Sequence, residues 1–159
     1  MIKKLVKNAF LAILIVLLLA QFFGPQKNDG DLASVEAFFE DTNPPEDVKL
    51  ILKDVCFDCH SDHTRYPWYN AITPVNYWLA DHIRHGKRGL NVSKWNNYTK
   101  KKKDHKLEEL VEDVQRRHMP LPSYTWTHSA AALTDAQVRA VTDWVQIARL
   151  KYVFVKEPQ

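Results

Sequence analysis

Both cysteines of this chain lie in a single pentapeptide, Cys56-Phe57-Asp58-Cys59-His60. Two thiols in a C-x-x-C spacing can each add to one vinyl group on the same edge of a porphyrin, and the histidine that follows can reach the iron as proximal ligand. The pattern is therefore typical of one covalently attached haem c, with Cys56 and Cys59 as attachment points and His60 on the iron. This feature constrains the fold most, because the large apolar face of a haem must be shielded from water.

Other uses of a C-x-x-C pair fit this sequence less well. A thioredoxin-like redox pair would follow a strand within a βαβ pattern, and no such pattern surrounds the motif. A zinc site would need a second pair of ligands, whereas the sequence has no further cysteine. A structural disulfide and a Cys2His-type metal site remain as alternatives to haem attachment.

The N-terminus carries an apolar run without charges, Ala9–Phe23, which follows Lys3, Lys4 and Lys7. Basic residues before an apolar run indicate an export signal, and under the positive-inside rule the lysines would stay in the cytoplasm. We therefore expect the chain beyond the run to lie in the periplasm.

The same run predicts a signal anchor rather than a cleaved signal peptide. A cleavage site needs a small-x-small pattern, which Leu18-Leu19-Ala20 fits poorly. Positions 5–23 comprise 19 residues, close to the length that crosses a bilayer. We predict an uncleaved transmembrane helix within residues 1–23 and a single-pass inner-membrane protein. A cleaved signal peptide and a buried helix of a soluble domain are the alternatives.

The remaining chain predicts one mainly α domain. We expect a polar linker at residues 24–42, a haem-binding domain at 43–150 and a tail at 151–159. Apolar residues recur at helical intervals in four segments, which begin or end with cap residues, prolines or glycine. A formal net charge of +3 is too small and too scattered to indicate nucleic-acid binding. The predicted helices cover 43–56, 73–86, 104–118 and 134–148, and a weak strand pattern covers 152–155.

A haem iron held by His60 still needs a sixth ligand or an open site. Met119 is the best candidate, because it is the only internal methionine and is followed by two prolines that stiffen the loop. A core-filling role is the alternative for Met119. His82, on the apolar side of the second predicted helix, is the runner-up, and His118 adjoins Met119. An open sixth position is a further alternative.

Residues just after the motif could shield the porphyrin. Trp68 and Tyr69 follow Pro67 in the loop past His60, so chain length alone keeps them near the haem. Arg65 is similarly near, and its guanidinium could pair with a haem propionate, with a solvated arginine as the alternative.

The stretch from about Pro45 to Trp144 resembles a bacterial family of membrane-anchored haem-binding domain proteins that carry one C-x-x-C-H motif. This resemblance implies haem binding and a periplasmic location. The Met-Pro loop and the amphipathic helix after it also resemble class I cytochromes c, in which such a methionine is the distal ligand. A long insertion between the motif and Met119 departs from that pattern. The family resemblance rests on 56–61, 66–69, 81–83, 90–95, 119–124 and His128.

These observations favour a membrane-tethered electron carrier, not an enzyme, that exchanges electrons with redox partner proteins which the sequence does not name. The rigid loop at Met119 argues for a permanent sixth ligand. The alternative is a haem-based gas or redox sensor, or a peroxidase-like enzyme, with an exchangeable sixth ligand near His82 or His118. A haemless interaction module that uses a disulfide is a third reading.

Overall fold

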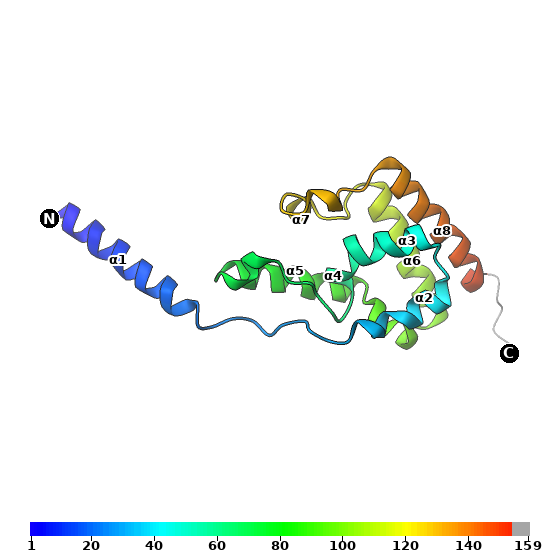
Figure 1. Ribbon diagram of the computed structural model, residues 1–159, viewed down its shortest axis with the longest axis horizontal. Helices are drawn as coiled ribbons and strands as arrows, with labels where there is room; N and C mark the ends of the chain where they lie inside the picture. The colour runs from blue at the N-terminus through cyan, green and yellow to red at the C-terminus, as the bar shows by residue number, and fades with distance from the viewer. Residues whose placement is uncertain (154–159) are drawn as a thin grey trace.

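Helices make up most of residues 1–153, the part of the chain that the computed structural model describes (Figure 1). This confirms the mainly α prediction. Short 3₁₀ and π-helical turns, labelled η, join the α-helices. The elements are α1 (Ile2–Ala20), η1 (Leu32–Val35), α2 (Glu36–Thr42), α3 (Glu46–Ile51), η2 (Leu52–Cys56), α4 (Phe57–His60), η3 (Trp68–Ala71), α5 (Val75–Gly89), η4 (Val92–Asn97), α6 (Lys100–Gln115), α7 (Pro122–Thr125), η5 (Ser129–Ala131) and α8 (Asp135–Val153).

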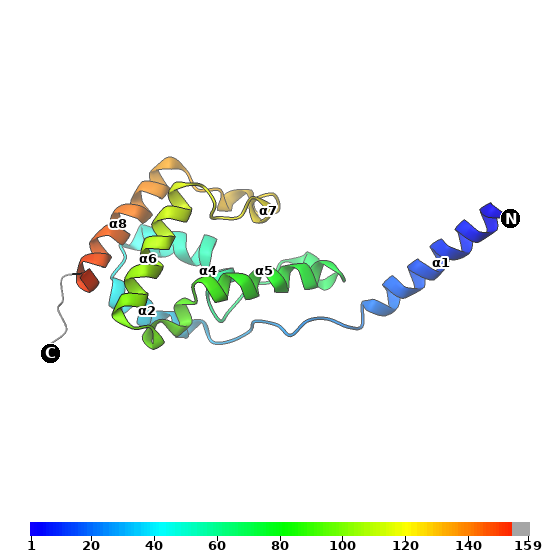
Figure 2. The same cartoon turned by 180° about the vertical axis from the view of Figure 1, so that it is seen from behind.

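Helix α1 lies apart from the other helices, at the end of an extended segment (Figures 1 and 2). Its first two turns contain all three lysines of the N-terminus, so the uncharged part runs only from Asn8 to Ala20. At 1.5 Å per residue that part is about 20 Å long, short of a hydrocarbon core of about 30 Å. Within residues 1–153, none of the helices has the length and apolar character needed to cross a membrane. The predicted transmembrane helix and the single-pass inner-membrane location are therefore wrong.

The segment predicted as a linker has two parts in the structure. Residues 24–31 are extended and run antiparallel to the chain that follows the motif, since Gly30 N–H donates to Asp62 O (2.8 Å) and Thr64 N–H to Asn28 O (2.9 Å). Residues 32–42 are helical, as η1 and α2, and bury Phe38 and Phe39. The second half of the predicted linker is thus part of the folded domain.

The core lies between α2, the motif, η4 and the α6–α8 pair, which pack side by side (Figures 1 and 2). Phe38 is at its centre. Its ring meets the ring of Trp95 edge-on at 4.9 Å between centroids, and the rings of Trp144 and Phe57 at 6.1 and 6.3 Å. Edge-to-face contacts of this kind are favourable because the positive ring edge meets the negative ring face.

The other helices largely follow the sequence prediction, with shifted ends. Helix α5 extends to Gly89 and buries Leu79 and Ile83. Helix α6 begins at Lys100, earlier than predicted, because the Thr99 side chain accepts a hydrogen bond from Lys102 N–H and caps the helix. The predicted strand is absent as far as Val153, where the chain belongs to α8, and its last two positions lie outside the described residues.

Candidate functional site

A cavity of about 410 Å³ opens between the motif, α5, the end of α6 and the segment that leads into α7. Its walls are mainly apolar, and its size is within the range of cofactor sites. Five of the candidate residues line it together, although 63 positions separate the first from the last (119 − 56 = 63). They are Cys56, Cys59, His60, His82 and Met119.

The motif reaches the cavity at the end of a continuous helical stretch. Helix α3 buries Val48 and Ile51, a π-helical turn follows over Leu52–Cys56, and α4 carries the rest of the motif. A π-helical turn inserted between α-helical turns is frequently found at functional sites.

Both cysteines are free thiols in the structure. Burial raises the pKa of Cys56 to about 12, with a further contribution from neighbouring Cys59 and Asp58, and it raises that of Cys59 to about 11. A thioredoxin-like redox cysteine needs the opposite shift, because its thiolate is the reactive form. The environment of the pair therefore fits thiols held against an apolar cavity.

His60 is oriented by a backbone contact. Its Nδ1 lies 3.0 Å from Leu90 O, and a carbonyl oxygen only accepts hydrogen bonds, so Nδ1 carries the proton. The other ring nitrogen, Nε2, is left with its lone pair for a metal. Burial lowers the pKa of His60 and keeps the imidazole in the neutral form that ligates iron.

Gly86, which sequence analysis treated only as a helix stop, lets α5 pack directly on the motif. A Cβ at this position would lie 2.7 Å from Cys59 O and 3.1 Å from Cys59 Cβ. Real Cβ atoms essentially never come within 2.7 Å of a backbone oxygen, so a larger residue at this position would force the motif or α5 to shift. The close approach brings the histidine-bearing face of α5 to the cavity.

Met119 is placed by the way α6 ends. Arg117 adopts the left-handed conformation (φ 58°), its N–H donates to Val114 O (3.2 Å), and His118 N–H donates to Asp113 O (2.9 Å). These are the two hydrogen bonds of a Schellman motif, with Arg117 at the position that usually holds glycine. The reversal turns the chain so that Met119, Pro120 and Leu121 form one wall of the cavity.

The two histidines considered as alternative ligands lie differently. His82 lines the cavity from α5, and its Nδ1–H donates to Trp78 O at 2.8 Å, which leaves Nε2 available. His118 is exposed, 3.7 Å from the carboxylate of Asp113, and is not part of the cavity wall.

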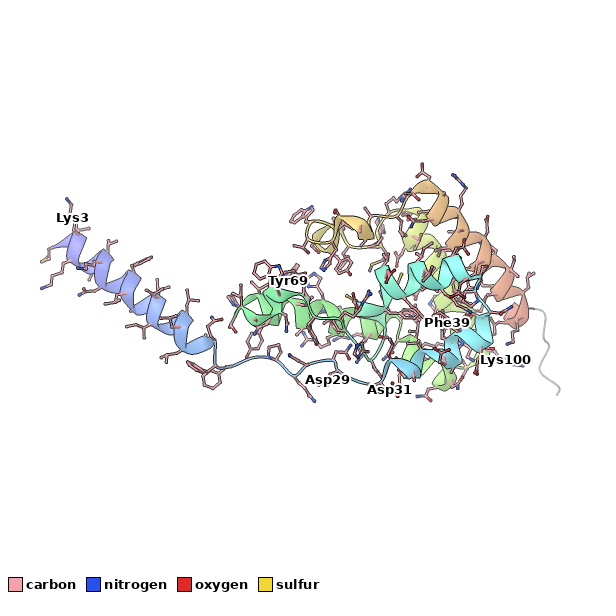
Figure 3. All side chains as sticks on the ribbon, in the orientation of Figure 1. Lys3, Asp29, Asp31, Phe39, Tyr69 and Lys100 are labelled. Atoms are coloured by element: carbon pink, nitrogen blue, oxygen red, sulfur yellow. The ribbon has the colours of Figure 1, made fainter. Side chains whose placement is uncertain are left out.

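Trp68 and Tyr69, predicted to shield the haem, and Arg65, predicted to pair with a haem propionate, lie outside the cavity wall. Arg65 forms ion pairs with Asp58 and Asp54, both at 3.0 Å. Trp68 is 80% exposed. Tyr69 faces the α7 region (Figure 3), and its hydroxyl lies 3.2 Å from Oγ1 of Thr127, just after α7. Chain reach placed these residues near the motif, but tertiary contacts turn them away from the cavity.

Sequence analysis missed a contact between the motif and α7. The Tyr124 hydroxyl donates to Asp58 Oδ2 at 3.2 Å, and Tyr124 lines the cavity. The ring of Tyr124 also stacks on His128 at 4.2 Å between centroids. No local sequence pattern predicts the contact between Asp58 and Tyr124, because these residues are 66 positions apart.

A family model described as a haem-binding domain matches residues 15–147, which is most of the chain. The chain belongs to the haem-binding domain family. Haem is therefore its cofactor, and the resemblance to a haem-binding domain family is confirmed. No curated protein and no solved structure matches the chain.

The residues of the cavity fit a haem. The walls are mainly apolar, His60 offers a neutral imidazole, and two thiols lie in the spacing that suits one porphyrin edge. Met119 offers a thioether on a wall formed by a separate segment of the chain.

Proposed function

We propose that this haem-binding domain carries one haem c, attached through Cys56 and Cys59 and ligated by His60 and Met119, and that it works as an electron-transfer protein. One observation carries the proposal. A single apolar cavity gathers both thiols, a neutral and oriented imidazole, and the only internal methionine.

Each residue would have a defined part in this site. The thiols of Cys56 and Cys59 would each add across a vinyl double bond, with sulfur bonding to one carbon and the hydrogen going to the other, so no oxidant is needed. His60 would bind the iron through Nε2, with its ring direction set by Leu90 O. Met119 would bind through its sulfur, which favours the ferrous form and raises the reduction potential. Haem iron itself supplies reversible one-electron exchange.

A spectroscopic experiment on the haem-loaded protein tests this ligand set. The haem should stay on the chain in a denaturing gel, and the ferric protein should show the far-red charge-transfer band of methionine-ligated haem. Met119→Ala should abolish that band, lower the reduction potential and allow CO to bind where the wild type resists it. His118→Ala is the matched control, because His118 is adjacent in sequence but lies outside the cavity wall. Haem that is extracted from the wild type by acid acetone would refute covalent attachment.

A second function is favoured by one observation. His82 and His85 line the same cavity from α5, and each donates its Nδ1–H to a backbone carbonyl one turn earlier. A polar group beside an exchangeable sixth position would suit binding of a diatomic gas or peroxide. Ready CO binding by the wild type, unchanged by Met119→Ala, would favour this sensor or peroxidase-like role over electron transfer.

A further inference from the structure

We infer that Asp58, the second variable residue of the C-x-x-C-H motif, is a positioning residue. Through Tyr124 it holds residues 119–121, called here the Met119 segment, closed over the cavity. The inference rests on the proposed ligation by Met119. It assigns to Asp58 and Tyr124 control over how easily the sixth ligand leaves.

The Met119 segment belongs to an arm, residues 118–131, that leaves the end of α6 and returns at the start of α8. The arm extends from the paired ends of these helices and runs beside α5 (Figures 1 and 2). Its base is held by Arg117, whose guanidinium donates to Leu133 O and pairs with Asp135.

Beyond this base, two side-chain hydrogen bonds join the arm to the rest of the domain. Tyr124 donates to Asp58, whose side chain is only 15% exposed, and Tyr69 meets Thr127 at an exposed position. A hydrogen bond to a carboxylate is stronger than one between neutral groups, and exposure to water weakens the second contact further. The Tyr124–Asp58 hydrogen bond is therefore the stronger of the two contacts that hold the arm beyond its base.

The Asp58 carboxylate is itself fixed in place. Arg65 donates to it through Nε (3.0 Å to Oδ1) and through Nη2 (3.2 Å to Oδ2), a two-point contact that sets the plane of the carboxylate. The same guanidinium also donates to Asp54 Oδ1 and to the carbonyl of Lys53. Arg65 thus orients the acceptor that Tyr124 uses.

The bond at Tyr124 acts on Met119 through a short and stiff connection. Tyr124 N–H donates to Leu121 O (2.9 Å), and Met119, Pro120, Leu121 and Tyr124 all line the cavity. Pro120 and Pro122 restrict the backbone between Met119 and Tyr124. Movement of Tyr124 away from Asp58 would therefore carry Met119 with it and open the sixth position.

The test is the rate of CO binding to the ferrous, haem-loaded full chain, measured by stopped flow under conditions in which departure of Met119 limits the rate. Tyr124→Phe keeps the ring and removes only the hydroxyl. We expect it to bind CO about tenfold faster than the wild type, since tenfold corresponds to about 1.4 kcal/mol, near the low end for a hydrogen bond to a charged group. Tyr69→Phe, which removes the exposed tie, should change the rate less than about twofold.

A double-mutant cycle separates the proposed bond from general loosening. Asp58→Ala should also speed CO binding, and the Asp58→Ala/Tyr124→Phe double variant should be no faster than Asp58→Ala, because both changes delete one bond. Asp58→Asn retains an acceptor oxygen and should restore part of the effect. The inference would be overturned if the double variant sped CO binding by the product of the two single-variant fold-increases, or if the Tyr124→Phe rate lay within twofold of the wild type.

The outcome also distinguishes this inference from the proposed function. A wild type without the far-red band would overturn ligation by Met119, and the inference would fall with it. A wild type that shows the band, together with an unchanged Tyr124→Phe rate, would overturn only the role of Asp58 and Tyr124.

Discussion

Replacing Gly86 by alanine tests whether α5 must touch the haem motif directly. In an ordinary helix the change would stabilise the protein by about 1 kcal/mol, because glycine is a poor helix former. Here the new Cβ would lie 2.7 Å from Cys59 O, a backbone atom that can move only with the motif. Overpacking of this kind costs about 1–3 kcal/mol, so the net result should be a loss of up to about 2 kcal/mol.

Gly89 provides a control in the same helix. A Cβ there would meet nothing within 4 Å, and neither glycine has a positive φ, so Gly89→Ala should gain about 0.5 kcal/mol. The assay is urea unfolding of both variants and the wild type, followed by tryptophan fluorescence. The two variants should differ by about 0.5–2.5 kcal/mol in the free energy of unfolding. A Gly86→Ala protein as stable as Gly89→Ala would refute the close packing of α5 on Cys59.

Two further predictions concern the core and the charge network around the motif. Phe38→Ala should lower the free energy of unfolding by about 3–5 kcal/mol, because Phe38 is fully buried among aromatic rings. Leu50→Ala, at a mostly exposed position, should change it by less than about 0.5 kcal/mol. Equal losses for the two variants in urea titrations would contradict the core assignment. For Asp62, burial alone would raise the pKa, but hydrogen bonds from Lys87, Asn91 and Lys94 outweigh it and lower the pKa from 3.8 to about 2. The stabilisation by Asp62 is therefore present above pH 4 and lost as the pH falls toward 2. The wild type should be more stable than Asp62→Asn by about 1–2 kcal/mol at pH 6, and this difference should disappear between pH 4 and pH 2. A difference in stability that is constant with pH would contradict the prediction.

Features that depend on local signals could be predicted from the sequence. The apolar spacing of Val48, Ile51, Leu52 and Val55 predicted a helix that leads into the motif; the first three are buried, and Val55 is half-buried against the core. The C-x-x-C-H pattern predicted a haem site, and the chain belongs to a haem-binding family. The predicted cap at Thr134 is confirmed, since its hydroxyl accepts a hydrogen bond from Gln137 N–H. The predicted start at Asn43 is wrong, because Asn43 ends α2 in the left-handed conformation and α3 begins at Glu46.

Features that depend on distant contacts, or on a balance of length and charge, could not be predicted in this way. The apolar run near the N-terminus predicted a membrane span, but the lysines occupy the first two turns of α1 and leave too short an uncharged stretch. Residues 32–42 were predicted as linker, and only the packed core shows that Phe38 contacts Trp95 and Trp144. The roles of Gly86 and Asp58 arise from partners far along the chain.

The two variable residues of the motif connect the cavity to different parts of the fold. Phe57 is buried in the core, with its ring 5.5 Å from that of Phe39 between centroids, so the packing of α2 bears on the position of both cysteines. Asp58 is bound by Arg65 and Tyr124 on the other side. The motif is therefore clamped between the aromatic core and the arm. Because neighbours in a dense interior shift together, a change in the core can alter the cavity without touching any residue that lines it.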